Sequence, residues 1–510
     1  MFSRRTFVRT VVAGAVTLAL CPAFAAQKTL SADIVVVGAG SAGLTAAVQA
    51  AQKGAKVIVL EKNPFIGGNS QHAEGVFAVG SEWQRLRSDV LTKQQAFEGL
   101  MERHLHKLDA NLVRDYVYGS AENVSWLASL GLTIECIRMT PWEEPTWHTF
   151  LDYKGVNHGA ALIKCLKDNA DKLGVKTLVS TPAKSLVTKD GVVVGVKARN
   201  DDSEDDYTIN AKAVILASGG FADAKHLKEL AHRDPEGWKH SVPIGKTGDG
   251  LEMAYKVGAQ KGRVSFVGHL GTEGKGISFP SQLYTTSWQP STLWVNSDGV
   301  RFDNEAVAFS FSQAANAIYS QFGHYGWSIY DESQVKYMME RGVDSGVGVL
   351  VPVGAKLTNL KKEIQIALDA KSDGFKAATS VADLAKQIGV PAKQLEKEIV
   401  EYNKWCEQGH DNRFFKDERY LRKIDTKKLY AIKLKSYFFS SYGGLVINRG
   451  FQVLDLKNKP IKGLYAAGLE VSNMVGDTYT TWSSGHAFGY ACYTGRHSGL
   501  LAAEFVKAAK

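Results

Sequence analysis

The fold is decided near the amino terminus, where residues 33–61 read DIVVVGAGSAGLTAAVQAAQKGAKVIVLE. A short apolar run leads into a Gly-rich turn, a helical stretch of small residues follows, and a second apolar run ends at Glu61. Gly38 permits a tight turn, Gly40 lets backbone N–H groups approach a pyrophosphate, and Gly43 allows close packing of helix on strand. Glu61 is spaced to accept a hydrogen bond from a ribose hydroxyl. The stretch predicts a Rossmann-like α/β fold that binds a dinucleotide.

Further glycine segments favour FAD over NAD as that dinucleotide. Glu61 and Lys62 run toward a second glycine loop, GGNS at residues 67–70, and a predicted strand at residues 213–217 ends in SGGF at residues 218–221. No second GxGxxG turn follows, which argues against a separate NAD(P)H-binding domain. We therefore expect electrons to reach the cofactor from another source.

The chain has 510 residues, more than a single hydrophobic core usually holds, and this length predicts two domains or one domain with a large insertion. Hydrophobic residues at 45% and charged residues at 22%, with a mean hydropathy of -0.16, are typical of a globular chain outside the membrane. The formal net charge of +9 comes without a run of Lys or Arg and without a nucleic-acid motif. We therefore expect no nucleic-acid partner.

Residues 1–25 are typical of an export signal, with a basic start, an apolar stretch from Val11 to Leu20 and an Ala-Phe-Ala ending. SRRTFV at residues 3–8 adds the paired arginines of a twin-arginine signal, a route for proteins that fold around a cofactor before export. The alternatives are an ordinary N-terminal helix and a lipid-modified Cys21, and the bulky Leu20 disfavours the second. We expect a periplasmic protein without a stable membrane span, because the apolar stretch is too short to cross a bilayer.

The cysteines show no metal-binding pattern. After the predicted signal they are Cys136, Cys165, Cys406 and Cys492, widely spaced and without CxxC or CxxCH. This spacing argues against zinc, an iron–sulfur cluster or covalently bound haem, so no metal site is predicted. We expect buried free thiols, because a chain of this length does not need disulfides.

A series of motifs resembles the fumarate reductase and succinate dehydrogenase flavoprotein superfamily. In order, the motifs are GAGSAG (38–43), EK (61–62), GGNS (67–70), ASGGF (217–221), TGDG (247–250), VN (295–296), RFDNE (301–305), YGG (442–444) and GLYAAG (463–468). The soluble branch of that superfamily includes flavocytochrome c fumarate reductases, urocanate reductase and the 3-ketosteroid dehydrogenases. The resemblance extends from residue 32 to the end of the chain.

The resemblance implies a Rossmann-like FAD-binding domain in two sequence pieces with an inserted α+β capping domain. The implied FAD-binding pieces are residues 32–265 and 441–510, and the implied cap is residues 266–440. Within the cap, the apolar spacing of residues 380–407 predicts a helix, a break at Pro391 and a second helix.

The resemblance also implies how FAD is held. Gly468 and Glu470 would close the flavin site, with Glu470 at the ribityl chain, and a helix opening near Ser484 and Gly485 would direct N–H groups at the N1/C2 edge. The full set of predicted FAD-binding residues is Gly38, Gly40, Ser41, Ala42, Gly43, Glu61, Lys62, Gly68, Asn69, Ser70, Ala217, Ser218, Gly219, Asp249, Gly468, Glu470, Ser484 and Gly485.

Positions that bind a dicarboxylate in the fumarate reductases carry other residues here. By the resemblance, a proton-donating arginine corresponds to Phe309, a carboxylate-binding histidine to Ser440, and a C-terminal arginine to a position near Trp482. Only His269 lies near a substrate histidine of that family. Because a carboxylate is held out of water by bidentate, permanently charged partners, fumarate reduction is disfavoured.

Two tyrosines are candidates for the catalytic proton. The segment around Tyr479 resembles the one in which 3-ketosteroid dehydrogenases place a carbonyl-polarising tyrosine, although their proton-abstracting tyrosine would fall at Phe309. Tyr442, beside the glycine pair, competes for the role, and either tyrosine could instead be a core residue packed near the flavin. His269 is the third catalytic candidate, and His486 is interpreted as a helix-start residue.

Aromatic residues accumulate in segments that line the family's pocket, namely Trp288, Trp294, Phe309, Tyr442, Tyr479 and Trp482. Any one of them could equally be ordinary core packing. Together with the missing arginines they favour an apolar or aromatic substrate with at most one carboxylate or ketone. The predicted substrate-pocket residues are Phe309, Trp288, Trp482 and Ser440.

The sequence therefore predicts an exported FAD enzyme that reduces the C=C bond of an α,β-unsaturated acid or ketone by hydride transfer from flavin N5. A tyrosine or water would supply the proton, and an external c-type cytochrome or quinol system would supply electrons. The alternatives are a dehydrogenase of a ketone or ketosteroid-like substrate, a fumarate reductase with a divergent site, and an electron-transfer subunit without its own substrate.

Overall fold

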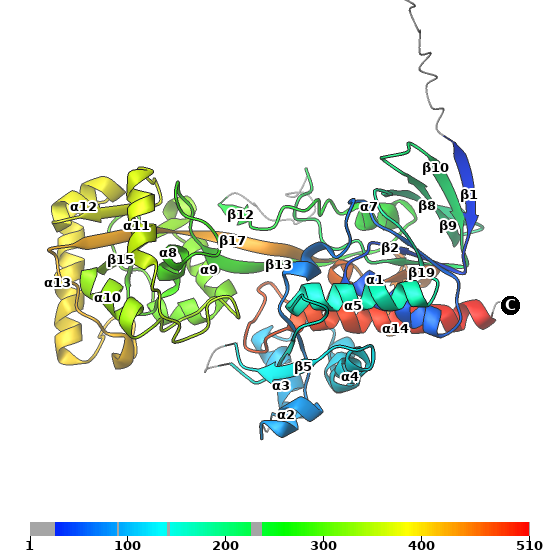
Figure 1. Ribbon diagram of the computed structural model, residues 1–510, viewed down its shortest axis with the longest axis horizontal. Coiled ribbons are helices and arrows are strands. Elements are labelled where there is room, and N and C mark those ends of the chain that lie inside the picture. The colour runs from blue at the N-terminus through cyan, green and yellow to red at the C-terminus, as the bar shows by residue number, and fades with distance from the viewer. Residues whose placement is uncertain (1–25, 89–90, 140–142, 226–236, 509–510) are drawn as a thin grey trace, which may run out of the picture.

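The computed structural model describes residues 26–88, 91–139, 143–225 and 237–508. The predicted export signal at residues 1–25 lies outside the described residues. The chain forms two lobes that stand side by side along the long axis of the molecule (Figure 1). Across the described ranges, no helix is both long and apolar enough to cross a membrane.

The first lobe is built on a six-stranded sheet with the order β18-β19-β11-β2-β3-β7. Its strands are β2 (Ile34–Val37), β3 (Val57–Leu60), β7 (Lys176–Leu178), β11 (Ala213–Leu216), β18 (Gln452–Leu454) and β19 (Pro460–Ala466). Neighbouring strands run parallel except at β18. β2, β3 and β11 are aliphatic and fully buried, the pattern of parallel strands covered on both faces.

Helices cover one face of this sheet, and a second sheet covers the other. α1 (Ser41–Gln52) packs between α5 (His158–Lys172) and α14 (His486–Ala508), as Figure 1 shows. The opposite face carries a sheet of order β1-β10-β9-β8, made of β1 (Gln27–Ser31), β8 (Ala183–Lys189), β9 (Val192–Arg199) and β10 (Asp206–Asn210). α7 (Asp249–Lys256) contacts β8. The strand, turn, helix and strand predicted for residues 33–61 are confirmed.

A three-stranded sheet of order β4-β6-β5 completes the first lobe. Its region comprises the 3-10 turn η1 (Gly68–His72), β4 (Gly75–Phe77), α2 (Glu82–Leu86), α3 (Lys93–Arg103), α4 (Ala110–Ser129), β5 (Ile134–Ile137) and β6 (Trp147–Phe150). β4 and α4 contact α14, and this unit therefore supports α14 from below in the view of Figure 1.

The second lobe combines a sheet with helices, as predicted for an α+β cap. Its sheet has the order β12-β17-β15-β14, and β13 and β16 also pair with β17. The strands are β12 (Trp238–His240), β13 (Lys261–Gly271), β14 (Leu293–Val295), β15 (Tyr325–Asp331), β16 (Phe375–Ala378) and β17 (Leu429–Leu445). The α-helices are α8 (Gln282–Thr285), α9 (Phe311–Tyr319), α10 (Glu332–Glu340), α11 (Leu360–Asp369), α12 (Val381–Ile388) and α13 (Ala392–Gln408).

Short 3-10 turns and one sharp break connect these helices. The turns are η2 (Thr286–Trp288), η3 (Glu305–Phe309), η4 (Phe322–His324) and η5 (Glu418–Tyr420). α12 ends at Gly389, whose φ is 74°, and α13 begins directly after Pro391. This confirms the helix, break and helix predicted for residues 380–407, because a left-handed glycine and a proline both stop a helix.

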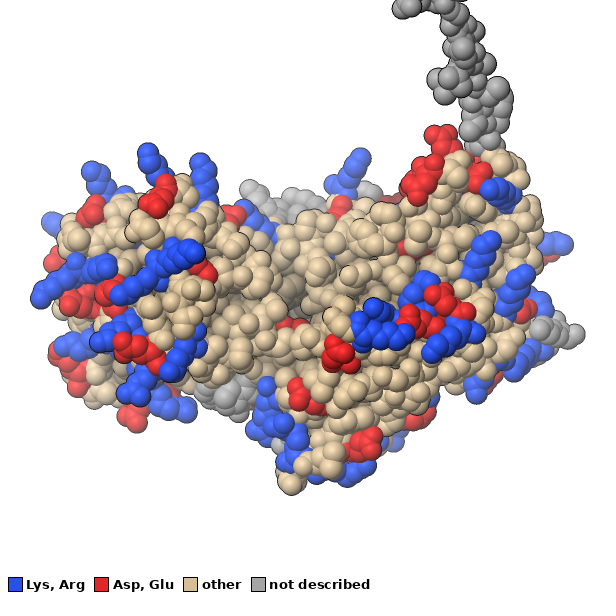
Figure 2. Space-filling view, in the orientation of Figure 1, with Lys and Arg blue, Asp and Glu red and all other residues tan. Residues whose placement is uncertain are grey.

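Two long strands join the lobes. β13 and β17 pair antiparallel, and β17 continues for 17 residues from the second lobe into the first (Figure 1). The boundaries expected at residues 265/266 and 440/441 fall inside these strands. The lobes are therefore joined by a hydrogen-bonded ribbon. On the face in Figure 2, Lys, Arg, Asp and Glu are interspersed over both lobes, and few lie on the hollowed surface between them.

The second lobe encloses a buried ionic network. Arg301 Nε and Nη2 each donate to Glu305 over 2.8 Å, and Arg301 Nη1 lies 2.8 Å from Asp411. Lys416 Nζ lies 2.9 Å from Glu305, and all four side chains are fully buried. Arg301 and Glu305 both belong to the RFDNE motif, so these two residues of the motif bind each other inside the lobe.

Candidate functional site

A pocket opens at the carboxyl ends of β2, β3 and β11. It is lined by Gly38, Gly40, Ser41, Ala42, Glu61, Lys62, Asn63, Gly67, Gly68, Asn69, Ser70, Ala217, Ser218, Gly219, Gly220, Ile244, Gly245, Lys246, Ala467, Gly468, Leu469 and Ala491. Parallel sheets bind ligands at this edge, because turns and helix N-termini present free N–H groups there. The predicted FAD-binding residues that do not line the pocket are Gly43, Asp249, Glu470, Ser484 and Gly485.

The three glycines of the first turn differ in their surroundings. A Cβ on Gly38, whose φ is 103°, would lie 2.3 Å from the carbonyl oxygen of Ala217, and a Cβ on Gly43 would lie 1.9 Å from that of Gly38. The chain itself requires these two glycines. A Cβ on Gly40 would meet nothing closer than Gly67 O, at 3.8 Å. The fold therefore does not itself require a glycine at position 40, which lines the pocket and lets a ligand approach the amino terminus of α1.

Glu61 and Lys62 follow β3, and their hydrogen bonds hold two neighbouring segments of the pocket in place. Buried Glu61 accepts hydrogen bonds of 2.9 Å from the N–H groups of Ala39 and Asn63. Burial raises the pKa of Glu61, and these N–H groups oppose the shift. Lys62 Nζ donates to Asp249 Oδ2 over 2.8 Å at the start of α7. Glu61 therefore supports the Gly-rich turn, and Lys62 ties β3 to α7.

The second glycine loop contacts the first turn and β17. Ser70 Oγ donates to Ser41 Oγ over 2.8 Å and accepts from the Ser41 N–H over 3.1 Å. Asn69 Nδ2 donates to the carbonyl oxygen of Phe439 over 3.0 Å. Lys246 Nζ, in turn, donates to Asn69 Oδ1 over 2.8 Å and to Phe439 O over 2.7 Å. The loop thus reaches from the dinucleotide turn to the strand that joins the lobes.

Lys246 was not predicted from the sequence. It is 6% exposed, and burial lowers its pKa to about 7 although Asp223 raises it. Its amine puts a titratable cation on the wall of a pocket suited to an anionic dinucleotide. The position directly before the TGDG motif was the available signal, since that segment lines the pocket.

Glu470, in the 3-10 turn η6 (Gly468–Glu470), contacts the turn after β11. Ser218 Oγ hydrogen-bonds to Glu470 Oε1, and Glu470 Oε2 is buried without a hydrogen-bond partner in the described part of the chain. Burial raises the pKa of Glu470 to about 8, so this carboxyl is protonated at neutral pH. The unpartnered oxygen fits a ligand hydroxyl, as the resemblance implies for the ribityl chain.

Tyr479 precedes α14 in the chain, and its side chain lies against the amino terminus of that helix. Its Oη accepts a hydrogen bond of 3.1 Å from the N–H of Ala487. Burial raises the pKa of Tyr479 to about 12, so the phenol keeps its proton and can donate it to a ligand. His486 Nε2 lies 2.9 Å from Met474 O, and burial lowers the pKa of this imidazole to about 4. Neutral His486 therefore fits a structural role at the helix start.

β17 presents two hydroxyls on one face, at Ser440 and Tyr442. Both hydroxyl oxygens are buried, and neither has a hydrogen-bond partner among the residues that the structure describes. A Cβ on Gly220 would lie 3.0 Å from Ser440 Oγ, so Ser440 adjoins the turn that lines the pocket. Buried unpartnered hydroxyls of this kind indicate a bound ligand or water.

His269 and Trp288 lie together in the second lobe, with ring centroids 6.4 Å apart. His269 Nδ1 lies 2.8 Å from a backbone carbonyl and Nε2 lies 3.1 Å from Ser241 Oγ. Burial lowers the pKa of His269 to about 4, and its ring stacks on Phe439 at 4.0 Å. With both ring nitrogens occupied, His269 is less suited than Tyr479 to proton delivery.

Phe309 and Trp482 contact different parts of the fold. The Phe309 ring lies 5.5 Å from the Tyr420 ring inside the second lobe. The guanidinium of Arg103 lies 4.6 Å from the centroid of Trp482, and a Cβ on Gly99 would lie 2.1 Å from that indole. Trp482 thus packs on α3, and neither predicted substrate residue lines the pocket described above.

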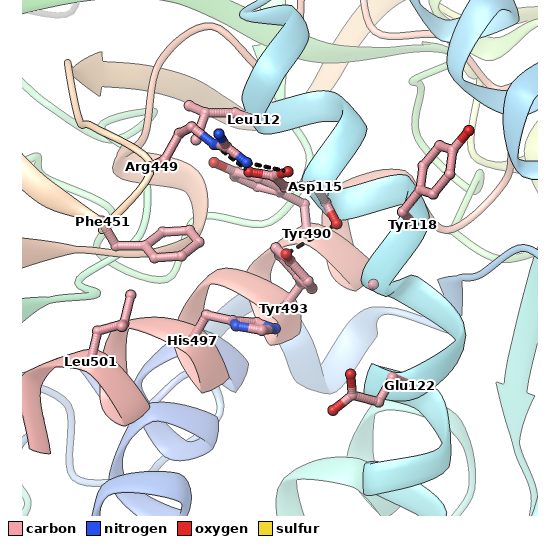
Figure 3. Close-up of a pocket in the computed structure, with 11 residues that line it drawn as sticks. Leu112, Asp115, Tyr118, Glu122, Arg449, Phe451, Tyr490, Tyr493, His497 and Leu501 are labelled. Atoms are coloured by element: carbon pink, nitrogen blue, oxygen red, sulfur yellow. Dashed lines mark hydrogen bonds and ion pairs between the residues drawn. The ribbon is translucent and has the colours of Figure 1, made fainter. Parts of the chain in front are cut away.

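A second pocket, of about 360 Å³, lies on a different face of α14, against α4 and the turn before β18 (Figure 3). It is lined by Leu112, Asp115, Tyr118, Gly119, Glu122, Arg449, Phe451, Tyr490, Tyr493, His497 and Leu501. Arg449 forms a bidentate ion pair with Asp115 over 2.7 and 2.8 Å, and Tyr493 Oη donates to Asp115 O over 3.0 Å. None of the Gly-rich turns reaches this pocket, so it is separate from the dinucleotide site.

The cysteines and acids add no metal site within the described ranges. Cys136, Cys165 and Cys492 are free and buried, whereas Cys406 is free and only half-buried.

The site has a Gly-rich turn at the edge of a parallel sheet and an acid after the next strand, and two strands join this lobe to a second one. These features define a two-lobed dinucleotide-binding flavoprotein. A family model for an FAD binding domain matches residues 33–484, and the chain belongs to this FAD-binding family. The chain is 37% identical over 486 residues to a vinyl phenol reductase of Lactiplantibacillus plantarum, which covers 93% of this chain and 97% of that protein. It is 28% identical to a urocanate reductase of Eggerthella lenta, over 88% of this chain and 71% of that one.

Solved structures agree with this assignment. The open conformation of a flavocytochrome c3 fumarate reductase superposes with a TM-score of 0.71 at 27% identity, over 94% of this chain and 79% of that chain. A 3-ketosteroid dehydrogenase from Rhodococcus jostii, at 23% identity and a TM-score of 0.73 over 93% and 97%, shows the same fold. The predicted superfamily, fold class and FAD cofactor are confirmed, and the protein is an FAD-dependent oxidoreductase that acts on C=C bonds.

Proposed function

We propose that this oxidoreductase reduces the C=C bond of an apolar or aromatic α,β-unsaturated acid or ketone and does not use a dicarboxylate. The observation that carries the proposal is the neutral character of Phe309, Ser440 and Trp482. By the resemblance to the fumarate reductases, Phe309 corresponds to a proton-donating arginine, Ser440 to a carboxylate-binding histidine, and Trp482 lies near the position of a C-terminal arginine. A dicarboxylate taken out of water without a bidentate cation loses its main stabilisation. The 37% identity to a vinyl phenol reductase supports an aromatic substrate without two carboxylates.

The pocket residues fit FAD, which when bound and reduced supplies the hydride. Gly40 and Ser41 would accommodate the pyrophosphate at the amino terminus of α1, and Glu61 would accept from the ribose. Ser218 and Glu470 would bind the ribityl chain, since Glu470 Oε2 has no protein partner in the described chain. Ser484 and Gly485 would present the amino terminus of α14 to the flavin.

Tyr479 is the group best placed to polarise the substrate. Because its oxygen accepts from the Ala487 N–H, its own proton is free for a substrate carbonyl or phenol oxygen. Tyr442 remains the competing candidate, with a buried hydroxyl that has no partner in the described chain.

The proposal includes an external electron donor and export to the periplasm. The sequence holds a single GxGxxG turn, which supports electron delivery by another protein. A c-type cytochrome is the expected donor, and it would be a separate chain because this one carries no CxxCH. The SRRTFV motif at residues 3–8 supports the twin-arginine route.

Anaerobic reoxidation tests the substrate class. The holoenzyme is reduced with one equivalent of dithionite and mixed with cinnamate, benzalacetone, 4-vinylphenol or fumarate, while flavin absorbance is followed. Rapid reoxidation by cinnamate or benzalacetone supports the proposal. Reoxidation by 4-vinylphenol alone would support an aromatic substrate but contradict the unsaturated acid or ketone. If none of the four reoxidises the flavin, and a saturated aryl ketone instead bleaches the oxidised enzyme, the ketone dehydrogenase alternative holds.

A further inference from the structure

Glu143 is a buried carboxyl beside α14 that none of the motifs contains. It is 6% exposed, and its Oε2 accepts a hydrogen bond of 2.5 Å from Ser484 Oγ, two residues before the helix. Its Oε1 is buried and has no hydrogen-bond partner within the described ranges. Burying a carboxyl oxygen without a partner is unfavourable, so its presence calls for a function.

The surroundings of Glu143 keep it neutral. The groups that interact with it are the hydroxyls of Ser484 and Thr481, and no Lys or Arg in the described chain forms an ion pair with it. The other titratable groups on the elements around it are Tyr479, His486, Glu144 and Arg103. Burial raises the pKa of Glu143 to about 8, so the carboxyl carries its proton at neutral pH.

Glu143 and Tyr479 are electrostatic neighbours with different acidities. Burial, reinforced by the Glu143 carboxylate, raises the pKa of Tyr479 to about 12. An acid transfers its proton most effectively when its pKa lies near the working pH, and Glu143 meets this condition better than Tyr479. Tyr479, which stays protonated, is instead suited to donate a lasting hydrogen bond.

We propose that Glu143 is the general acid of the C=C reduction and that Tyr479 hydrogen-bonds the oxygen substituent of the substrate. This inference rests on the proposed function. One alkene carbon takes the hydride that bound, reduced FAD supplies, the π bond breaks, and the other carbon takes the proton from Glu143 Oε1. The substrate gains two electrons, and the flavin is oxidised. The Ser484 hydroxyl stabilises the Glu143 carboxylate, which solvent then reprotonates.

The competing explanation is a structural one, in which Glu143 only fixes the segment before α14. Glu143→Gln separates the two, because the amide still accepts from Ser484 but has no acidic proton. Glu144→Gln is the matched control, since Glu144 is the next residue, is only half-buried, and is held through its backbone N–H to Trp482 O.

The test measures flavin reoxidation by 4-vinylphenol and cinnamate from about pH 6 to about pH 10 in the three holoenzymes. For the wild type, the rate should fall roughly tenfold per pH unit above about pH 8, because the acid must be protonated. Glu143→Gln should be slower by about 100-fold or more, lose this pH dependence, and keep its FAD content and melting temperature. Glu144→Gln should match the wild type.

Glu143→Gln reacting within about threefold of the wild type, or keeping the wild-type pH profile, overturns the proposal. If neither compound reoxidises the flavin, that result contradicts the proposed function. The protonation state of Glu143 is then tested by a measurement that needs no substrate. Because Glu470 is also protonated at neutral pH, Glu143 is followed in the infrared difference spectrum between the wild type and Glu143→Gln, in which the Glu470 band cancels. This difference should contain a carboxylic acid band at neutral pH that disappears above about pH 8, and the difference between the wild type and Glu144→Gln should contain none. Absence of that band would show an ionised Glu143 and exclude it as the acid.

Discussion

Gly40 and Gly67 lie side by side in the two glycine loops of the dinucleotide pocket. A Cβ on Gly40 would stand 3.8 Å from the carbonyl oxygen of Gly67, although the two residues form a backbone bridge. The same addition at Gly43 would collide with Gly38 O at 1.9 Å. The protein fold alone therefore tolerates a side chain at Gly40 but not at Gly43, and the glycine at position 40 is explained by the bound cofactor.

We predict that Gly40→Val folds but does not retain FAD, because its side chain occupies the space of the pyrophosphate. Flavin absorbance of the purified variant measures retention, and circular dichroism checks the fold. Gly43→Ala is the contrasting variant and should fail to accumulate as folded protein. A Gly40→Val enzyme with full flavin content would show that the cofactor lies elsewhere.

Substitution of Glu470 tests its protonated state. Because burial raises the pKa of Glu470 to about 8, its neutral carboxyl resembles an amide, and Glu470→Gln should bind FAD within a few-fold of the wild type. Glu470→Ala removes the partner of Ser218 and of the ligand hydroxyl, and should weaken FAD binding by roughly 10- to 100-fold. Titration of the apoprotein with FAD measures both. Equal loss in the two variants would mean that the carboxylate charge is needed.

The two arginine ion pairs should differ sharply in their contribution to stability. Arg301→Ala leaves Glu305 and Asp411 buried without their shared partner and should lower the free energy of unfolding by about 3–5 kcal/mol. Arg449→Ala removes a pair whose arginine side chain is 63% exposed and screened by solvent, so the free energy of unfolding should hardly change. Urea denaturation of the holoenzymes gives both values. Similar values for the two variants would contradict the burial that the structure shows.

Tyr479→Phe should slow reoxidation of the reduced flavin by an aryl enone by about 100-fold, because the hydrogen bond to the developing charge on oxygen is lost. FAD content should not change, and loss of the acceptor for Ala487 should lower stability by about 1 kcal/mol. Tyr442→Phe is the control. If reoxidation is slow in Tyr442→Phe and unchanged in Tyr479→Phe, then Tyr442, and not Tyr479, is the tyrosine that hydrogen-bonds the substrate oxygen.

The dinucleotide half of the site could be predicted from the sequence because it is local. Gly38, Gly40 and Glu61 lie within one strand, turn, helix and strand, where spacing alone determines position. Glu143 could not be found this way, and the only sequence signal for Lys246 was its position directly before the TGDG motif. Both side chains are buried against segments that are distant in the sequence: Lys246 contacts Phe439, and Glu143 contacts Ser484. The spacing of residues in a single sequence does not predict such long-range contacts.

The second lobe shows the same limit. Its helix break at Gly389 and Pro391 is a local signal and was predictable. The orientation of Trp482 was not, because its indole packs on Gly99 nearly four hundred residues earlier in the chain. Arg301 likewise belongs to a motif near the predicted pocket, yet its guanidinium is fully engaged inside the lobe.

The most direct measurement compares fumarate with an aromatic alkene as oxidant of the dithionite-reduced holoenzyme. If Phe309, Ser440 and Trp482 leave no anchor for a dicarboxylate, fumarate loses roughly 2–5 kcal/mol of binding free energy from its charged groups. At equal concentration, fumarate should then reoxidise the flavin about 30-fold to several thousand-fold more slowly than the faster of cinnamate and 4-vinylphenol. Flavin absorbance at matched pH gives the ratio in one experiment. Fumarate reoxidising the enzyme as fast as, or faster than, both aromatic compounds would contradict the proposed substrate class.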